Sequence, residues 1–264
     1  MNFGVEGIHP SQWLTLTGHR KAAILKRDFT FRERGTIMVW GILGALEEEV
    51  ALIKEKMTIE RQTPMYGTVF YEGTIGEHNI VLVCCGIGKV NAAVCASTAI
   101  HQFGAGRIIN VGIAGAMKLG LSVMDVVISS EVAFHDQDPV MLRYYPNRQF
   151  FEADPYLISL CEEACASLPE INGHFGRGRI VSGDVFVNDS AVKADINKRL
   201  APSCVEMEGA AIGQVSYMNG KPFLVIRTMS DSADEGADTS YDNFIEVAAG
   251  HSAKIILKML ELAR

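Results

Sequence analysis

The sequence lacks the features that would point to a membrane, a metal or a nucleic acid. It contains no run of about 18 apolar residues, so we expect no membrane-spanning helix and no membrane partner. The net charge is −7, and the chain has no surplus of Lys and Arg with which to bind nucleic acid. The six cysteines form no CxxC pair with partner histidines, which argues against a zinc site.

Two common catalytic motifs are also missing. The G-x-S-x-G turn of serine hydrolases does not occur. The segment Cys85–Ala93 (CGIGKVNAA) is not a Walker A loop, because Val83 replaces the first glycine and Val90 replaces the Ser or Thr. Its glycines would still allow the backbone to approach a ligand closely, and a tight turn without a ligand is the alternative.

The length and composition are those of one globular domain. The chain has 264 residues and is 48% hydrophobic, which is enough for one substantial core. Its scattered cysteines suit a reducing compartment, so we expect a cytoplasmic protein. The stretch Met1–Gly35 is rich in basic residues and has neither periodicity nor the apolar core of a signal peptide. We expect residues 1–37 to be a flexible extension or an over-long start, and residues 38–264 to form the domain.

Strand and helix patterns alternate along the rest of the chain. We expect strands at 37–43, 69–75, 79–84, 107–111, 123–133, 178–182 and 222–229, with a strand end at 205. We expect helices at 47–57, 90–103, 155–167, 191–199 and 242–262, with another helix ending at 219. This alternation predicts a single α/β domain with a central twisted, mostly parallel mixed sheet flanked by helices.

Acidic residues stand where several of these strands end. Glu49 follows the first strand, and Asp231 follows the last. Glu206 and Glu208 follow a break at Ala201–Pro202. Ligands of parallel α/β sheets bind at the carboxyl ends of the strands, where these side chains would converge. Together they would supply an acid, a base and a sugar clamp, which is what cutting a glycosidic bond requires.

Each of these acids also has a purely structural interpretation. Glu47 and Glu48 are better explained as first-turn residues, which the helix dipole stabilises by roughly 0.3–1 kcal/mol each. Arg227 and Asp231 would form an ordinary ion pair, and the glutamates after the Ala-Pro break would lie in a solvated turn. His135 is better explained as a solvated or structural histidine than as one half of an acid/base pair with its neighbour.

Seven segments, taken in order, resemble the nucleoside phosphorylase and hydrolase superfamily and, within it, the 5′-methylthioadenosine/S-adenosylhomocysteine nucleosidase family. They are GILGALEEEV (41–50), GIGKV (86–90), NVGIAG (110–115), HD (135–136), SGD (182–184), VEME (205–208) and RTMSD (227–231). The resemblance runs from about Val39 to Leu262. The nucleoside phosphorylase-like fold that it implies agrees with the alternation of elements.

The resemblance implies a role for most of the site residues. Glu49 matches the base that activates the attacking water, and Asp231 matches the acid that protonates adenine at N7. Glu208 matches the clamp on the ribose hydroxyls, and Met207 packs against the sugar. The other expected contacts are Phe186 and Val187 at the purine, Arg227 near the water, Tyr241 over the 5′-alkylthio end, and Ile87, Glu206 and Ser230 from the same motifs.

The implied reaction is hydrolysis of the N-glycosidic bond of 5′-methylthioadenosine and S-adenosylhomocysteine. It would release adenine and the 5′-thio-substituted ribose, with no metal or organic cofactor. A homodimer is also implied. The alternatives are hydrolysis of another adenine nucleoside (aminodeoxyfutalosine or 5′-deoxyadenosine), a purine nucleoside phosphorylase, and a non-catalytic binding module. Glu49 favours water over phosphate, because a carboxylate repels phosphate.

Two segments depart from the family pattern. Cys85 stands where family members commonly have a serine, and its thiol is the weaker hydrogen-bond donor. The segment Gln137–Phe151 differs in the region that shapes the mouth of the pocket. The sequence therefore determines the type of reaction better than the preferred 5′-substituent.

Overall fold

The computed structural model describes residues 38–233 and 237–263, with residues 237–243 described through their backbone alone. The expected extension, residues 1–37, lies outside the described residues. The elements described below belong to one compact unit, Ile37–Arg264.

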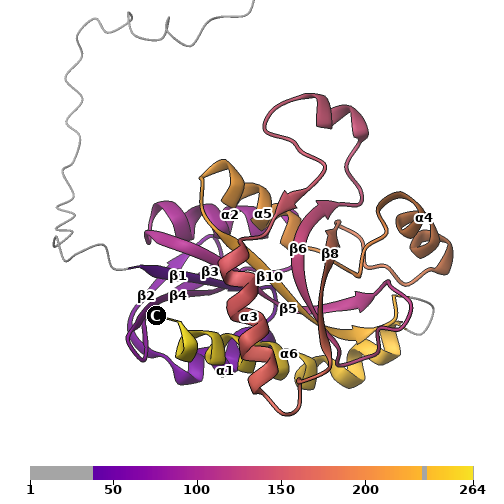
Figure 1. The fold of residues 1–264 in the computed structure, drawn as a ribbon. Helices are drawn as coiled ribbons and strands as arrows, with labels where there is room; N and C mark the ends of the chain where they lie inside the picture. Colours follow the sequence, from indigo (N-terminus) through magenta and orange to yellow (C-terminus); the bar gives the residue numbers. More distant parts are fainter. Residues whose placement is uncertain (1–37, 234–236, 264) are drawn as a thin grey trace, which may run out of the picture. The chain divides into compact units, whose positions relative to one another are not determined.

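The strands form one mixed sheet (Figure 1). They are β1 (Val39–Gly44), β2 (Thr58–Met65), β3 (Thr68–Ile75), β4 (His78–Cys84), β5 (Ala105–Ala116), β6 (Val126–Phe134), β7 (Phe151–Glu152), β8 (Phe175–Ser182), β9 (Cys204–Glu206) and β10 (Phe223–Asp231). The order is β10-β6-β8-β9-β5-β1-β4-β3-β2, and β10 also pairs with β5. Strands β5, β9, β8, β6 and β10 therefore form a closed ring of pairings.

Parallel pairs lie at the centre of this sheet. Strand β5 runs parallel to β1 and to β10, and β8 runs parallel to β6 and to β9. The antiparallel pairs include the β2–β3–β4 meander at one end. The expected mixed sheet with flanking helices is confirmed. The carboxyl ends of several of its strands lie at the same edge of the sheet.

Helices cover both faces of the sheet. They are α1 (Glu47–Lys56), α2 (Lys89–His101), α3 (Pro155–Ser167), α4 (Ser190–Leu200), α5 (Gly209–Met218) and α6 (Ala237–Leu262), with a 3-10 turn η2 (Pro139–Arg143). Helix α6 packs against α1 and α3, and α2 packs against α5 on the other side of the sheet (Figure 1). No helix in the described part of the chain is both long and apolar enough to cross a membrane.

Local sequence explains where the elements begin. Helix α3 starts at Pro155 because Asp154 accepts a hydrogen bond from the Leu157 N–H (3.0 Å), and proline suits the first helical position. Strand β5 is buried from Ile108 to Ala116, as expected of a strand with helices on both faces.

The structure corrects three expectations. The strand expected at 107–111 continues through 112–115 as part of β5. Strand β10 extends through Asp231 rather than ending before it. Strand β2 was not expected, because its sequence TIERQTPM is largely polar and most of its residues are exposed.

Candidate active site

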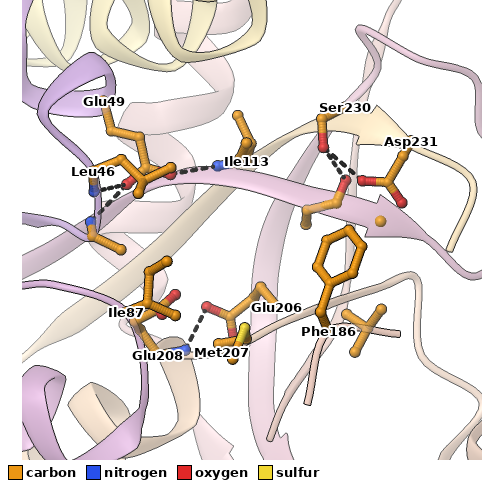
Figure 2. Close-up of a pocket in the computed structure, with 14 residues that line it drawn as sticks. Leu46, Glu49, Ile87, Ile113, Phe186, Glu206, Met207, Glu208, Ser230 and Asp231 are labelled. Carbon is orange, nitrogen blue, oxygen red and sulfur yellow. Dashed lines mark hydrogen bonds between the residues drawn. The ribbon is translucent and has the colours of Figure 1, made fainter. Parts of the chain in front are cut away.

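A pocket opens where six strands end (Figure 2). The segments that form it end or follow β1, β4, β5, β8, β9 and β10. Its lining residues are Ala45, Leu46, Glu49, Ile87, Ile113, Ala114, Gly115, Phe186, Val205, Glu206, Met207, Glu208, Ser230 and Asp231. Four carboxyl groups from three separate parts of the chain are thus brought together in one largely apolar pocket.

Glu49 lies at one end of the pocket and is held by backbone donors. Its Oε2 accepts hydrogen bonds from the N–H groups of Ala45 (2.6 Å) and Leu46 (3.0 Å), and its Oε1 accepts one from Ile113 (3.1 Å). The residue is only 3% exposed. Burial raises the pKa of Glu49, although Arg227 and the three N–H donors act in the opposite direction.

The carboxylate of Glu49 fits because Gly112 has no side chain. A Cβ at Gly112 would collide with the Oε1 atom of Glu49. Gly112 therefore leaves room for the Glu49 carboxylate beside β5.

Asp231 lies at the other end of the pocket, within β10 (Figure 2). Its Oδ1 accepts a hydrogen bond from the Ala233 N–H (2.8 Å), and its Oδ2 accepts one from the Ser230 hydroxyl (2.7 Å). Asp231 pairs with Gly115 of β5, whereas Glu49 is bonded to Ile113 of the same strand. The two carboxylates therefore lie beside different residues of one strand and face the same pocket.

Arg227 lies behind the pocket as the counter-ion of its acidic residues. It is 1% exposed, forms an ion pair and hydrogen bond with Glu206, hydrogen-bonds to Asn110, and lies 3.8 Å from Glu208 Oε2. Burial alone would lower the pKa of Arg227, but Glu206, Glu49 and Glu208 raise it. The guanidinium is therefore a permanent positive charge between acidic groups, and it does not pair with Asp231 in the way considered from the sequence.

Glu206 has protein partners for both carboxylate oxygens. It accepts hydrogen bonds from the N–H groups of Glu208 (3.1 Å) and Gly209 (2.8 and 3.0 Å), and from the Ser182 hydroxyl. These bonds fix the start of α5 and orient the adjacent residues toward the pocket.

Glu208 is a buried carboxyl group between the Gly88 backbone and the charge of Glu206. Its Oε1 accepts a hydrogen bond from the Gly88 N–H (2.9 Å). Burial, together with the charge of Glu206, raises the pKa of Glu208 to about 8. The pocket therefore favours the protonated form of Glu208, which lies beside Met207 and Ile87.

The residues expected at the purine lie close to Asp231. Phe186 is 40% exposed and lines the main pocket. Val187 is buried and lines a smaller adjoining cavity, which it shares with Phe186 and Asp231. This side of the site presents apolar surface on which a base could stack.

Cys85, which departs from the family pattern, is buried near the acidic groups. Its thiol donates a hydrogen bond to the Gly86 carbonyl (3.3 Å). Burial and the charges of Glu208 and Glu49 raise the pKa of Cys85, so it stays a neutral thiol. Within residues 38–233 and 237–263, no group of three His, Cys, Asp or Glu side chains is arranged to hold a metal ion.

Most of the predicted residues meet in this pocket. Arg227 stands one layer behind it, and the Tyr241 side chain lies outside the described residues. The sequence analysis missed Ala45, Leu46 and Ile113, which act through their backbone and so carry no side-chain signal. It also missed Asn110, although a polar residue inside the apolar run of β5 could have indicated a functional side chain.

Comparison with known proteins places this chain in a family. Residues 40–261 match the model of the Phosphorylase superfamily. A 5′-methylthioadenosine/S-adenosylhomocysteine nucleosidase of Exiguobacterium sp. (strain AT1b) is 43% identical over 84% of this chain and 99% of its own length. The Neisseria meningitidis nucleosidase of the same name, solved in complex with methylthio-immucillin-A, has a TM-score of 0.82 and 38% identity, covering 86% of this chain and 100% of that one.

A second enzyme class is nearly as similar in structure. Futalosine hydrolase of Helicobacter pylori strain 26695 has a TM-score of 0.80 and 31% identity, covering 86% of this chain and 98% of that one. The pocket described above lies entirely within the matched region. The chain belongs to the phosphorylase superfamily and, within it, to the family of 5′-methylthioadenosine/S-adenosylhomocysteine nucleosidases.

Proposed function

We propose that this protein hydrolyses the N-glycosidic bond of 5′-methylthioadenosine and S-adenosylhomocysteine, with Asp231 as the acid and Glu49 as the base. The observation that carries the assignment is the placement of these two buried carboxylates at opposite ends of one pocket, both attached to β5. Water is the second substrate, and adenine and the 5′-thio-substituted ribose are the products.

Asp231 supplies the proton that makes adenine a leaving group. Adenine leaves poorly as an anion, so a proton must reach N7 as the bond from C1′ to N9 breaks. Asp231 lies beside Phe186 and Val187, on the side of the pocket where the base would stack. Its hydrogen bonds to Ser230 and Ala233 fix the direction in which the carboxyl points. A positioned acid of this kind contributes about 10²–10⁴ in rate.

The ribose becomes positively charged as adenine departs, and the pocket is suited to that charge. Glycosidic cleavage passes through an oxocarbenium-like transition state. The pocket contains the carboxyl groups of Glu49, Glu206 and Glu208 against the guanidinium of Arg227. A carboxylate fixed in a buried site, such as Glu206 in its ion pair with Arg227, stabilises a developing cation electrostatically. Glu208, which the Gly88 N–H orients, is placed to bind the ribose hydroxyls, with Met207 against the sugar.

Glu49 completes the reaction by taking a proton from water. The water oxygen bonds to C1′ as its proton passes to the carboxylate. Three backbone N–H groups hold Glu49 in one orientation, so little reorganisation is needed when the water attacks. Ile87 and the Tyr241 side chain are proposed to contact the sugar and the 5′-alkylthio group.

The test is adenine release in phosphate-free buffer. Purified protein is incubated with 5′-methylthioadenosine, and adenine is followed by chromatography. Rapid release with water alone is the expected result. If adenine appeared only after phosphate was added, the protein would be a phosphorylase and Glu49 could not be the base that activates water.

A second substrate is favoured by the similarity to futalosine hydrolase. Aminodeoxyfutalosine and 5′-deoxyadenosine present the same adenine and ribose to the residues of this pocket, and differ only at the 5′ end. Parallel assays with these nucleosides rank the substrates. A kcat/KM for aminodeoxyfutalosine well above that for 5′-methylthioadenosine would reassign the physiological substrate and leave the chemistry unchanged.

A cytoplasmic homodimer is proposed as the working form. A groove between α2, η2 and α5 is lined by apolar side chains, among them Val90 (72% exposed) and Met218 (54% exposed). Exposed apolar surface of this kind favours association. The cysteines are free and mostly buried, as is usual in a reducing compartment. Light scattering at micromolar concentration tests the dimer, and a monomer there would contradict it.

A further inference from the structure

Three segments that the proposed chemistry does not use meet beside the pocket, where Lys89 and Asp136 also line the groove between α2, η2 and α5. Lys89 begins α2, Asp136 follows β6, and Asp184 follows β8. The Lys89 ammonium lies 2.5 Å from Asp136 Oδ2 and 3.5 Å from Asp184 Oδ2. The backbone N–H of Asp184 donates to the same Asp136 oxygen (3.0 Å). We call these three residues the rim cluster.

The rim cluster also caps helix α2 from outside the helix. The N-cap residue Gly88 offers no side chain, and the first turn of α2 contains no acidic residue. Instead, Asp184 Oδ1 accepts a hydrogen bond from the Lys89 N–H (2.9 Å). Gly88 has a φ of 100°, which L side chains rarely adopt, and a Cβ there would lie 3.2 Å from Asp184 Oδ1. A carboxylate at this helix end is stabilised by the unpaired N–H groups and the dipole.

Each end of the rim cluster leads directly to a residue that lines the pocket. Gly88, the neighbour of Lys89, donates the N–H that orients Glu208. Phe186 lies two residues beyond Asp184 and lines the opposite part of the pocket (Figure 2). A displacement of the rim cluster would therefore affect both Glu208, which is proposed to bind the ribose, and Phe186, which is proposed to contact the purine.

We propose that Lys89, Asp136 and Asp184 are positioning residues that set the spacing between the ribose-binding and purine-binding segments. This inference rests on the proposed function, because it concerns the same nucleoside. The residues do not touch the reacting atoms. They act through the Gly88 N–H on one side and through the chain from Asp184 to Phe186 on the other.

The side chains of the rim cluster are partly exposed, which argues for a positioning role and against a large contribution to overall stability. The side chains of Lys89, Asp136 and Asp184 are 25%, 23% and 50% exposed. Ion pairs at such positions contribute little to folding and are weakened by salt. Glu49 and Asp231 are attached to β5 and not to the cluster, so loss of the cluster is expected to weaken nucleoside binding and to spare the chemical step.

The chain offers a matched control for the test. Arg179 and Glu131 form an ion pair between β8 and β6 with 26% and 23% exposed side chains, nearly the values of Lys89 and Asp136. Neither residue of this pair lines the pocket. Asp136→Ala and Glu131→Ala therefore remove equivalent carboxylates, one in the rim cluster and one outside it.

Steady-state kinetics with 5′-methylthioadenosine is the first measurement. Asp136→Ala and Lys89→Met are expected to raise KM about tenfold, which corresponds to a loss of about 1.4 kcal/mol in binding, with kcat within about twofold of wild type. Lys89→Arg is expected to restore most of the lost affinity, because it keeps the positive charge. Glu131→Ala is expected to leave KM unchanged. Equal KM values for the two alanine variants, or a fall in kcat at constant KM, would overturn the inference.

Amide hydrogen exchange gives a second readout that does not depend on turnover. The segment 183–187 is expected to exchange faster in Asp136→Ala than in wild type or Glu131→Ala. If the wild-type protein released no adenine, the proposed function would fail while the exchange data would still judge the positioning role. Unchanged exchange in this segment would refute that role even in an active enzyme.

Discussion

Glu49 and Asp231 stand at the two ends of one pocket, but the protein holds them by different kinds of partner. Glu49 accepts hydrogen bonds from three backbone N–H groups, which are donors only and cannot rotate. Asp231 accepts hydrogen bonds from a backbone N–H and from the hydroxyl of Ser230, which can donate or accept. Replacing Asp231 by its amide should therefore lower activity and leave stability nearly unchanged. Replacing Glu49 by its amide should lower both activity and stability.

The largest combined effect is expected from Glu49→Gln. The amide keeps one acceptor oxygen and places an NH₂ group against a fixed backbone donor. Loss of the base lowers kcat about 10²–10⁴-fold, and the unsatisfied buried donors lower the free energy of unfolding by about 1–3 kcal/mol. Kinetics with 5′-methylthioadenosine and urea unfolding measure the two effects.

Glu48→Gln is the control for this variant, because Glu48 lies in the same first turn of α1 and is exposed. It is expected to change neither activity nor stability appreciably. Unaltered hydrolysis by Glu49→Gln would remove the base assignment, and unaltered stability would remove the contrast between the two ends.

Asp231→Asn is expected to lose as much activity without the loss of stability. The Asn oxygen keeps the Ala233 N–H, and its NH₂ group donates to the Ser230 hydroxyl, which turns to accept. Turnover should fall about 10²–10⁴-fold because an amide cannot deliver the proton to N7. The free energy of unfolding should stay within about 1 kcal/mol of wild type. Wild-type turnover, or destabilisation equal to that of Glu49→Gln, would contradict this account.

Gly112→Ala tests the tight fit at the Glu49 end without changing either acid. The new Cβ would collide with the Glu49 carboxylate, and overpacking of this kind costs about 1–3 kcal/mol. Both activity and thermal stability are expected to fall. Gly176→Ala in β8 is the matched control, because a Cβ there meets no atom within 4 Å. Equal behaviour of the two variants would show that the fit at Gly112 is loose.

The raised pKa of Glu208 predicts a change in the pH dependence of stability. The pKa of Glu208 is raised from 4.5 to about 8, so the folded state binds more protons than the unfolded state between these values. Stability contributed by the protonated form is therefore lost as pH rises from about 4.5 to about 8. Glu208→Gln should make this fall shallower, as measured by urea unfolding at several pH values. Parallel curves for the two proteins would show that Glu208 does not titrate in this range.

Much of the fold was predictable because the apolar runs and helix starts are local signals. Helix α3 was predicted at its observed bounds from Pro155 and the apolar periodicity that follows. Strand β2 was missed because its stability comes from pairing with β3, and not from an apolar face of its own. Strand β5 was predicted to end at residue 111, but it continues to Ala116, and the small size of Gly112 lets Glu49 approach it.

The candidate site was predictable in its acids but not in what orients them. Residue type and position indicated acidic residues at the strand ends, and the family resemblance selected Glu49, Glu208 and Asp231 among them. The backbone donors of Ala45 and Ile113 could not be predicted, since every residue other than proline has an N–H. Only the fold decides which N–H groups point at the Glu49 carboxylate. For the same reason, no sequence pattern indicated that Glu206 would be occupied by protein donors on both oxygens.

Strand β5 positions both carboxylates of the proposed acid–base pair. Glu49 and Asp231, the proposed base and acid, are placed against Ile113 and Gly115 of this strand, so their positions depend on a continuous backbone and not on the packing of exchangeable side chains. Residues around the 5′ end of the nucleoside can therefore diverge, in nature or in the laboratory, while the distance from acid to base stays constant. An engineer who wishes to change the substrate of this enzyme would therefore vary the residues around the 5′ end and leave β5 unchanged.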